Sequence, residues 1–145
     1  MVKTKKSLGQ NFLTDELILN RILETVNPKK QDKFFEIGCG RGALTKRLIP
    51  KIKSIDGVEI DKDLISSLRK LESSSTDLTI HQDSVLKINL DKLSRNKSKF
   101  RVIGNLPYNL SSKIMLWTFS NAEHIFDIHY MFQKEIGRAS CRERV

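Results

Sequence analysis

Cysteine is scarce in this sequence: only Cys39 and Cys141 occur among its 145 residues. Their positions suggest neither a disulfide framework nor a zinc-binding spacing. The three histidines also lack a ligand-like spacing to cysteines or carboxylates, so we expect them to be structural or surface residues. Together these patterns predict a protein of a reducing, cytoplasmic compartment that has no metal site.

Long apolar runs are absent as well. No segment approaches the roughly 18 consecutive apolar residues that a membrane-spanning helix needs. The N-terminus is basic but lacks the apolar stretch of a secretory signal sequence. We therefore expect a short basic arm at this end and no membrane partner.

Positive charge, by contrast, is abundant, with 26 Lys and Arg against 17 Asp and Glu and a net charge of +9. A basic excess in a chain of this size suggests an anionic partner, most often a nucleic acid. The length suits one domain, and a hydrophobic content of 39% permits a core. Nothing in the composition points beyond a monomer.

Segments with strand-like and helix-like patterns alternate along the chain, which favours a doubly wound α/β fold with a parallel sheet covered on both faces. Asp15 is a candidate cap for the first helix, and Pro50 is expected to end the second. The predicted helices span 16–26, 42–51, 62–73 and 111–119. The predicted strands span 33–38, 54–60, 77–82, 101–106 and 126–132.

Three glycines, Gly38, Gly40 and Gly42, stand between the first strand and the second helix. Glycine lets a backbone turn tightly and approach a ligand without a Cβ clash. Glu59 ends the second strand, 21 residues after Gly38, and can accept hydrogen bonds from both hydroxyls of a ribose. Asp83 follows the third strand and can accept a bond from an adenine amino group. We expect these residues to bind a nucleoside-containing cofactor.

Two cofactor classes fit this arrangement, a nicotinamide dinucleotide and S-adenosylmethionine. The dinucleotide fingerprint is Gly-x-Gly-x-x-Gly, whereas here the glycines are spaced Gly-x-Gly-x-Gly and follow Glu36. That spacing favours S-adenosylmethionine. The alternative interpretation is that Glu36 and Glu59 are solvated acids at strand ends. Cys39 fills a small-residue position, and we do not expect a catalytic thiol.

The segment Asn105-Leu106-Pro107-Tyr108 ends the fourth strand, at the sheet edge where ligands of open parallel sheets bind. The side-chain oxygen of Asn105 and the carbonyl of Leu106 can accept both N–H groups of a nucleobase amine. Pro107 stiffens the turn, and Tyr108 can stack on the base. The alternative interpretation gives the segment only a structural role, as a tight turn with a buried tyrosine.

These four residues suit methyl transfer to an exocyclic amine. Two accepted hydrogen bonds favour a pyramidal nitrogen whose lone pair is available. The leaving group is neutral, so catalysis needs positioning and electrostatic support, not a strong base. The base has to leave its helix or be single-stranded already.

At this point the sequence resembles the rRNA adenine N-dimethyltransferases, whose motifs occur here in order over about residues 5–135. The matching segments are Gly9–Leu13, Glu36–Thr45, Val58–Asp61, Gln82–Ser84 and Gly104–Met115. Leu106 and the N-terminal motif are most similar to the branch that dimethylates two adjacent adenosines of small-subunit rRNA during ribosome assembly. The resemblance implies a Rossmann-like class I methyltransferase sheet.

The resemblance also implies roles for residues that spacing alone does not single out. It places Gln10 and Phe12 over the site and the basic arm near RNA phosphates. It implies cofactor contacts at Asn11, Leu13, Gly38, Glu59, Asp83 and Asn105. Two further strands and a helical C-terminal domain of the family have no counterpart here, so we expect an incomplete sheet, weak cofactor binding and little or no activity of these 145 residues alone.

Residues 136–145 lack any apolar period and resemble a translated sequencing adapter. We therefore expect the methyltransferase domain to span 1–135 and the remainder to be a non-native tail. Three other functions remain open: a large-subunit rRNA methyltransferase that gives antibiotic resistance, a non-catalytic nucleic-acid-binding factor on the same scaffold, and a nicotinamide oxidoreductase.

Overall fold

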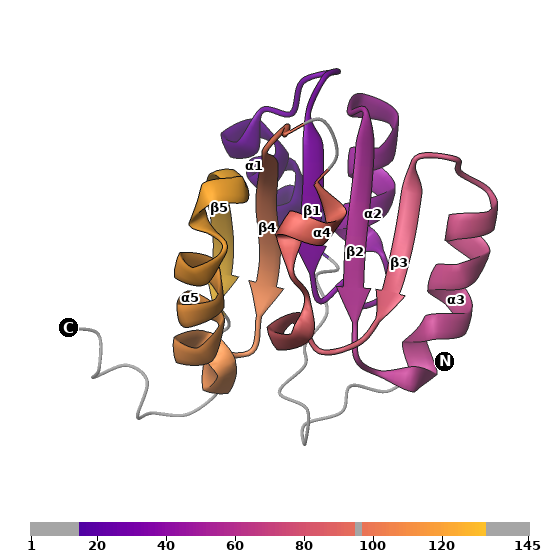
Figure 1. Ribbon diagram of the computed structural model, residues 1–145. Coiled ribbons are helices and arrows are strands. Elements are labelled where there is room, and N and C mark those ends of the chain that lie inside the picture. Colours follow the sequence, from indigo (N-terminus) through magenta and orange to yellow (C-terminus); the bar gives the residue numbers. More distant parts are fainter. Residues whose placement is uncertain (1–14, 95–96, 133–145) are drawn as a thin grey trace.

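The computed structural model describes residues 15–94 and 97–132, which form a parallel sheet of five strands in the order β3-β2-β1-β4-β5. In Figure 1 all five arrowheads point the same way. The strands are β1 Lys33–Ile37, β2 Ser54–Glu59, β3 Leu78–Gln82, β4 Phe100–Leu106 and β5 Ile125–Phe132. Because the order reverses between β1 and β4, the sheet is doubly wound, which confirms the predicted fold class.

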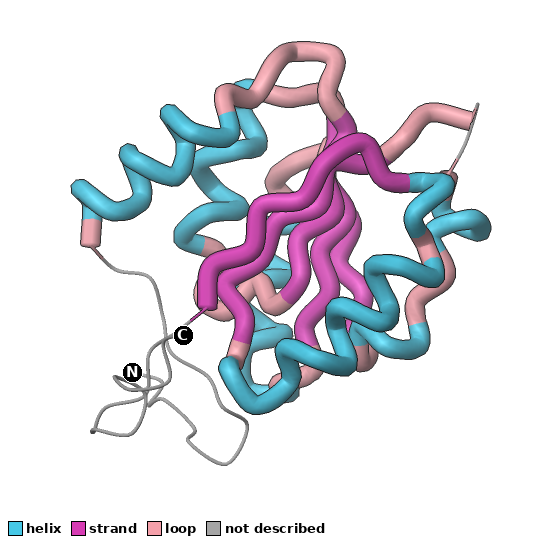
Figure 2. The backbone as a smooth tube through the Cα atoms, turned by 90° about the vertical axis from the view of Figure 1, so that its left-hand side faces the viewer, coloured by secondary structure: helices cyan, strands magenta, loops and turns pink. Residues whose placement is uncertain are grey.

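Helices cover both faces of this sheet, as the edge-on view of Figure 2 shows. The helices are α1 Glu16–Val26, α2 Ala43–Leu48, α3 Lys62–Ser73, α4 Leu90–Leu93 and α5 Ser111–Ser120. No helix in the described part of the chain is both long and apolar enough to cross a membrane.

The side chains of β1 alternate between two separate cores. Phe34 packs in the core that contains Leu19 of α1 and Leu48 of α2, while Phe35 packs in the core that contains Trp117 of α5. The rings of Phe35 and Trp117 are stacked with their centroids 5.6 Å apart. A strand buried on both faces is what a continuous apolar run predicts.

The helix boundaries show which local patterns were read correctly. Asp15 caps α1, because its carboxylate accepts a bond from the Leu17 amide at 2.9 Å, as predicted. The predicted helix 42–51 is wrong in its last three residues: α2 ends at Leu48, and Pro50 lies in a short 3-10 turn. The sequence patterns also missed α4, which Asn89 caps.

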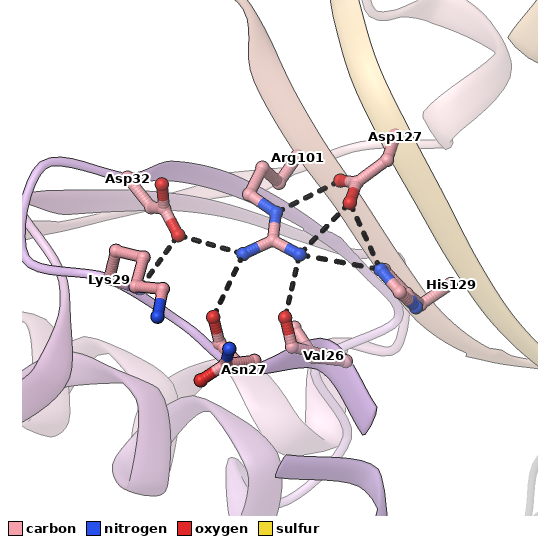
Figure 3. Close-up of polar contacts among 7 residues, drawn as sticks. All are labelled: Val26, Asn27, Lys29, Asp32, Arg101, Asp127 and His129. Carbon is pink, nitrogen blue, oxygen red and sulfur yellow. Dashed lines mark hydrogen bonds and ion pairs between the residues drawn. The ribbon is translucent and has the colours of Figure 1, made fainter. Parts of the chain in front are cut away.

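Arg101 of β4 ties α1 to the sheet (Figure 3). Its guanidinium donates to Asp32 before β1 at 2.7 Å, to both carboxylate oxygens of Asp127 on β5 at 3.0 and 2.9 Å, and to the Val26 carbonyl at 2.7 Å. That carbonyl lies at the C-terminal end of α1, where helix carbonyls lack partners in the helix itself. Arg101 of β4 therefore links the C-terminal end of α1 to β5 and to the residue before β1.

Candidate functional site

The four predicted site positions lie at the carboxyl ends of four adjacent strands of the sheet. Asp83 follows β3, Glu59 ends β2, Gly38 follows β1, and Asn105 is the penultimate residue of β4. The register pairs Ile37 with both Val58 and Gly104, so Gly38 lies between Glu59 and Asn105. The structure thus brings together residues that are more than 60 positions apart in the sequence. Their roles in binding stay predictions.

The glycine loop has a backbone that favours glycine at three positions. Gly38, Gly40 and Gly42 have φ angles of 72°, 58° and 81°, in the left-handed region that costs other residues free energy. The Gly38 amide donates to the Val58 carbonyl at 2.8 Å, which fixes the loop against β2. A Cβ at Gly38 would lie 3.9 Å from the backbone oxygen of Asn105. The loop therefore passes close to the end of β4.

Glu59 is buried, with 3% of its surface exposed, and its carboxylate is held by backbone groups. Oε1 accepts the Gly40 amide at 2.8 Å, and Oε2 accepts the Asp61 amide at 2.9 Å. Burial raises the pKa of Glu59, while these two hydrogen bonds oppose that shift. These two backbone donors orient the carboxylate at the end of β2, beside the glycine loop.

Glu36, on β1 just before the glycine loop, is also buried, and it supports that loop. The Thr45 hydroxyl of α2 donates to its carboxylate, which links the strand before the loop to the helix after it. Burial raises the pKa of Glu36 to about 8, and the neighbouring charge of Glu59 adds to this shift. The interpretation of Glu36 and Glu59 as solvated strand-end acids is therefore wrong. Thr45 was not singled out in the sequence, because nothing in the pattern there shows which way its hydroxyl points.

Cys39 lies inside the loop as a small packing residue. It is buried at 5% exposure, and burial raises the pKa of its thiol well above the ordinary value. A thiol that stays protonated is a poor nucleophile. This environment agrees with the expectation that Cys39 is not catalytic.

The end of β4 combines a buried anchor with an exposed ring. Leu106 is fully buried, whereas Tyr108 is 56% exposed and begins a 3-10 turn that ends at Leu110. Pro107 has a φ of −65°, and its carbonyl accepts the Leu110 amide at 3.2 Å. The tight turn of the alternative interpretation is present, but its buried tyrosine is wrong, because Tyr108 is exposed. Asn105 is half-buried beside it.

Other predicted residues differ in how much can be said of them. Asp83 is half-buried, and its carboxylate accepts the amide of Ser84 at 2.8 Å. Asp61 caps α3 and is buried at 2% exposure. Asn11 and Leu13 lie outside the described residues, as do residues 136–145.

Histidine and carboxylate side chains form pairs in this protein. His81 bonds Asp56 at 2.9 Å, and His129 bonds Asp127 at 3.2 Å. Within residues 15–94 and 97–132, no group of three or more His, Cys, Asp or Glu side chains is arranged to hold a metal ion.

Comparison with known proteins identifies the family of the chain. The family model described as ribosomal RNA adenine dimethylase matches residues 1–144. The chain belongs to this family. A ribosomal RNA small subunit methyltransferase A of Pseudomonas fluorescens is 40% identical over 134 residues, which cover 92% of this chain and 49% of that protein. Its counterpart from Coxiella burnetii is 40% identical over 139 residues, which cover 96% and 54%.

Two solved structures of methyltransferases are similar in fold to most of this chain. A dimethyladenosine transferase from Plasmodium falciparum superimposes with a TM-score of 0.71 at 29% identity, covering 86% of this chain and 44% of that one. The 23S rRNA methyltransferase ErmE gives a TM-score of 0.70 at 26% identity, covering 85% and 48%. The chain spans about half the length of the curated relatives it matches.

Proposed function

We propose that the protein is an rRNA adenine dimethyltransferase that transfers methyl groups from S-adenosylmethionine to two adjacent adenosines of small-subunit rRNA during ribosome biogenesis. The observation that carries this proposal is the meeting of the glycine loop, Glu59 and Asp83 with the Asn105-Leu106-Pro107-Tyr108 turn at one sheet edge. Relatives named as small-subunit methyltransferases support the choice of substrate. A monomeric, cytoplasmic enzyme is part of the same proposal.

The residues on β1, β2 and β3 suit the cofactor. The positive φ angles of Gly38 and Gly40 let the chain pass close to a ligand without a side chain in the way. The carboxylate of Glu59, oriented by the Gly40 and Asp61 amides, suits ribose hydroxyls, and Asp83 suits the adenine amine. Bound there, S-adenosylmethionine supplies an electrophilic methyl group. Asn11 and Leu13 complete the proposed contacts.

The residues on β4 suit the methyl acceptor. The Asn105 side-chain oxygen and the Leu106 carbonyl accept the two N–H groups of the adenine amine and orient its lone pair. The exposed ring of Tyr108 is available to stack on the flipped base, which is worth about 1–3 kcal/mol. Because the fully buried Leu106 anchors the turn, these acceptors keep their position before the substrate arrives.

The main alternative is methylation of large-subunit rRNA by the same chemistry. The likeness to ErmE, a 23S rRNA methyltransferase, supports it. Leu106 and the names of the curated relatives favour the small subunit. A non-catalytic nucleic-acid-binding factor is disfavoured because both the glycine loop and the β4 turn retain residues suited to chemistry.

Methyl transfer from labelled S-adenosylmethionine, measured in parallel with undermethylated small ribosomal subunits and with unmethylated large-subunit rRNA, tests the proposal. The enzyme is the longest open reading frame that contains this chain, compared with its Asn105→Ala variant. Asn20→Ala, an exposed position on α1, is the matched control and is expected to keep full activity.

We expect label in two adjacent small-subunit adenosines and its loss, by about a hundredfold or more, in Asn105→Ala. Label in large-subunit rRNA alone would move the enzyme to the other branch. Cofactor binding without any label would support the binding factor.

A further inference from the structure

A groove of about 790 Å³ runs along the amino ends of the strands, at the edge opposite the candidate site. All five strands, or the residues that lead into them, contribute to its walls, and α4 forms one side. Five adjacent strands span roughly 19 Å, which is four spacings of about 4.8 Å. The groove is therefore long enough for several nucleotides of an extended strand.

The walls of this groove are basic. Five cationic side chains and two carboxylates line it, which leaves a net charge of +3 with its histidine neutral. The cations are Lys33, Lys53, Lys92, Lys99 and Arg101. Field lines from like charges concentrate in a concave surface, so a groove of this charge attracts anions more strongly than scattered lysines do.

Both carboxylates in the groove already have partners. Asp32 accepts from Arg101 at 2.7 Å, and Asp56 is bonded to His81 at 2.9 Å. Lys53, Lys92 and Lys99 are exposed, and they form no ion pair with any residue that the structure describes. Three lysine charges thus remain available to a ligand, while the acids that could neutralise them are engaged elsewhere.

The groove also offers groups that recognise RNA beyond its charge. The ring of Phe126 at the start of β5 is 71% exposed and forms part of the lining. An aromatic ring beside lysines is typical of single-stranded RNA surfaces, where bases stack on the ring and phosphates lie along the cations. The hydroxyls of Ser54 and Thr79 can donate to phosphate oxygens. The combination of an exposed ring with lysines that are unpaired within the described residues favours single-stranded RNA as the occupant.

We propose that this groove binds a single-stranded segment of rRNA by its phosphates, as an anchoring site distinct from the catalytic edge. The proposal rests on the proposed function, because it requires an RNA substrate. The seven residues of β4 separate the two edges by roughly 20 Å at about 3.3 Å per residue. An RNA segment in the groove is therefore not the target nucleotide, and it acts on substrate affinity without touching the reacting atoms.

The test compares three variants of the longest open reading frame that contains this chain. The groove variant is Lys53→Gln/Lys92→Gln/Lys99→Gln. The matched control is Lys46→Gln/Lys51→Gln/Lys70→Gln, which removes the same charge from exposed lysines outside the groove. The third variant is Phe126→Ser. Binding to undermethylated small ribosomal subunits is measured at several salt concentrations, together with kcat, KM and the affinity for S-adenosylhomocysteine.

Each lost phosphate contact lowers the salt-dependence slope by about 0.7 for single-stranded RNA, so we expect the groove variant to lose about 2 units. Its KM rises about tenfold or more at 0.1 M salt, while kcat and cofactor affinity stay unchanged. Phe126→Ser weakens binding about tenfold without changing the slope. The control variant keeps most of its slope.

Equal slopes for the groove and control variants would overturn the proposal and leave the proposed function intact. A wild-type protein that binds cofactor but neither binds nor methylates ribosomal subunits would overturn both. The cofactor measurement separates these outcomes from a folding defect, because a misfolded variant loses that affinity as well.

Discussion

Gly57 of β2 has no side chain, which leaves room for the sulfur of Cys39 in the glycine loop. A Cβ built at Gly57 would lie 2.4 Å from the Cys39 sulfur and 3.3 Å from the Ile80 side chain. We predict that Gly57→Ala lowers the free energy of unfolding by about 1–3 kcal/mol, because the buried sulfur has to move. Urea unfolding measures this change.

The matched test is the double variant Gly57→Ala/Cys39→Ala, in which the sulfur is gone. Its loss of stability should be smaller than the sum of the two single losses by about 1 kcal/mol or more. Strictly additive losses would mean that the sulfur is not what Gly57 accommodates.

Glu36 makes stability depend on pH. Its pKa is about 8 in the folded protein against 4.5 as its ordinary value. Below pH 4.5 the carboxyl is protonated in both states, so it has no effect. Between pH 4.5 and 8 the unfolded chain releases this proton while the folded protein keeps it, so stability falls as pH rises, by about 1.4 kcal/mol per pH unit.

Glu36→Gln, which can still accept from Thr45, should remove this dependence. We predict that the stability of the variant relative to the wild type increases steadily from pH 5 to pH 8 in urea unfolding. Glu24→Gln, at an exposed position on α1, is the control and should follow the wild-type curve. A constant difference between Glu36→Gln and the wild type across this range would contradict the prediction.

For single residues, the sequence predicted which residues form the candidate site but not how deeply each of them is buried. Gly38, Glu59, Asp83 and Asn105 were all predicted to meet, because each ends or follows a strand and parallel strands end at one edge. The burial of Glu36 was not predicted. It depends on Thr45 and Cys39 closing over the carboxylate, which no periodicity reports.

Among the elements, α1 is attached to the sheet through the side chain of Arg101 on β4. Arg101 has only 12% of its side chain exposed and joins the end of α1 to Asp32 and Asp127. Burial on its own would raise the pKa of Asp127, but the hydrogen bonds and charges of Arg101 and His129 lower it overall. The Asp127 carboxylate therefore stabilises the fold at pH values above its ordinary pKa. This contribution is lost as the pH falls through the lowered pKa of the folded protein.

We predict that Arg101→Met costs about 3–5 kcal/mol, because two partly buried carboxylates lose their partner. Arg101→Lys should be intermediate, since lysine keeps the charge but lacks the planar fork. Arg21→Met, at an exposed position on α1, is the control and should cost less than about 0.5 kcal/mol.

Hydrogen exchange then locates the damage from Arg101→Met. The amides of α1 should exchange faster relative to those of β1 and β2. Uniformly faster exchange throughout the protein would mean that Arg101 stabilises the whole fold and not the attachment of α1.

Secondary structure was predicted well where an element is long. The predicted bounds of α1 and α3 match the structure, because eleven and twelve residues give a clear helical period and an Asp cap begins each. The four residues of α4 are about one turn, too short for a period to show. Pro50 marked the end of α2 only approximately, because proline is accepted in the first turn of a following 3-10 helix.

On the scale of the whole molecule, the net charge and the apolar outer strand β5 have opposite effects on self-association. β5 ends the strand order among the described residues, and Phe126, Ile128 and Phe132 on it are exposed by 71%, 38% and 46%. An apolar edge strand promotes association, while the net charge of +9 keeps copies apart. We predict that association of this 145-residue chain increases with salt, which sedimentation velocity would measure.

Ile128→Lys should reduce this association at every salt concentration, because charge on an edge strand disfavours pairing. Ile18→Lys adds the same charge on α1, where the wild-type side chain is 46% exposed, and it serves as the control. An equal reduction by both variants would assign the effect to charge alone and not to the strand edge.

The strand order also has a consequence for the protein while it is being made. The central strand β1 pairs with β2 on one side and β4 on the other, and 69 residues separate the ends of β1 and β4. At about 5–20 residues per second, translation of that interval takes roughly 3 to 14 s. During that time the nascent chain can assemble the half that carries the glycine loop, Glu59 and Asp83. The half that carries Asn105 joins it last, so the cofactor edge has its first three strands before the turn proposed to hold the base has emerged.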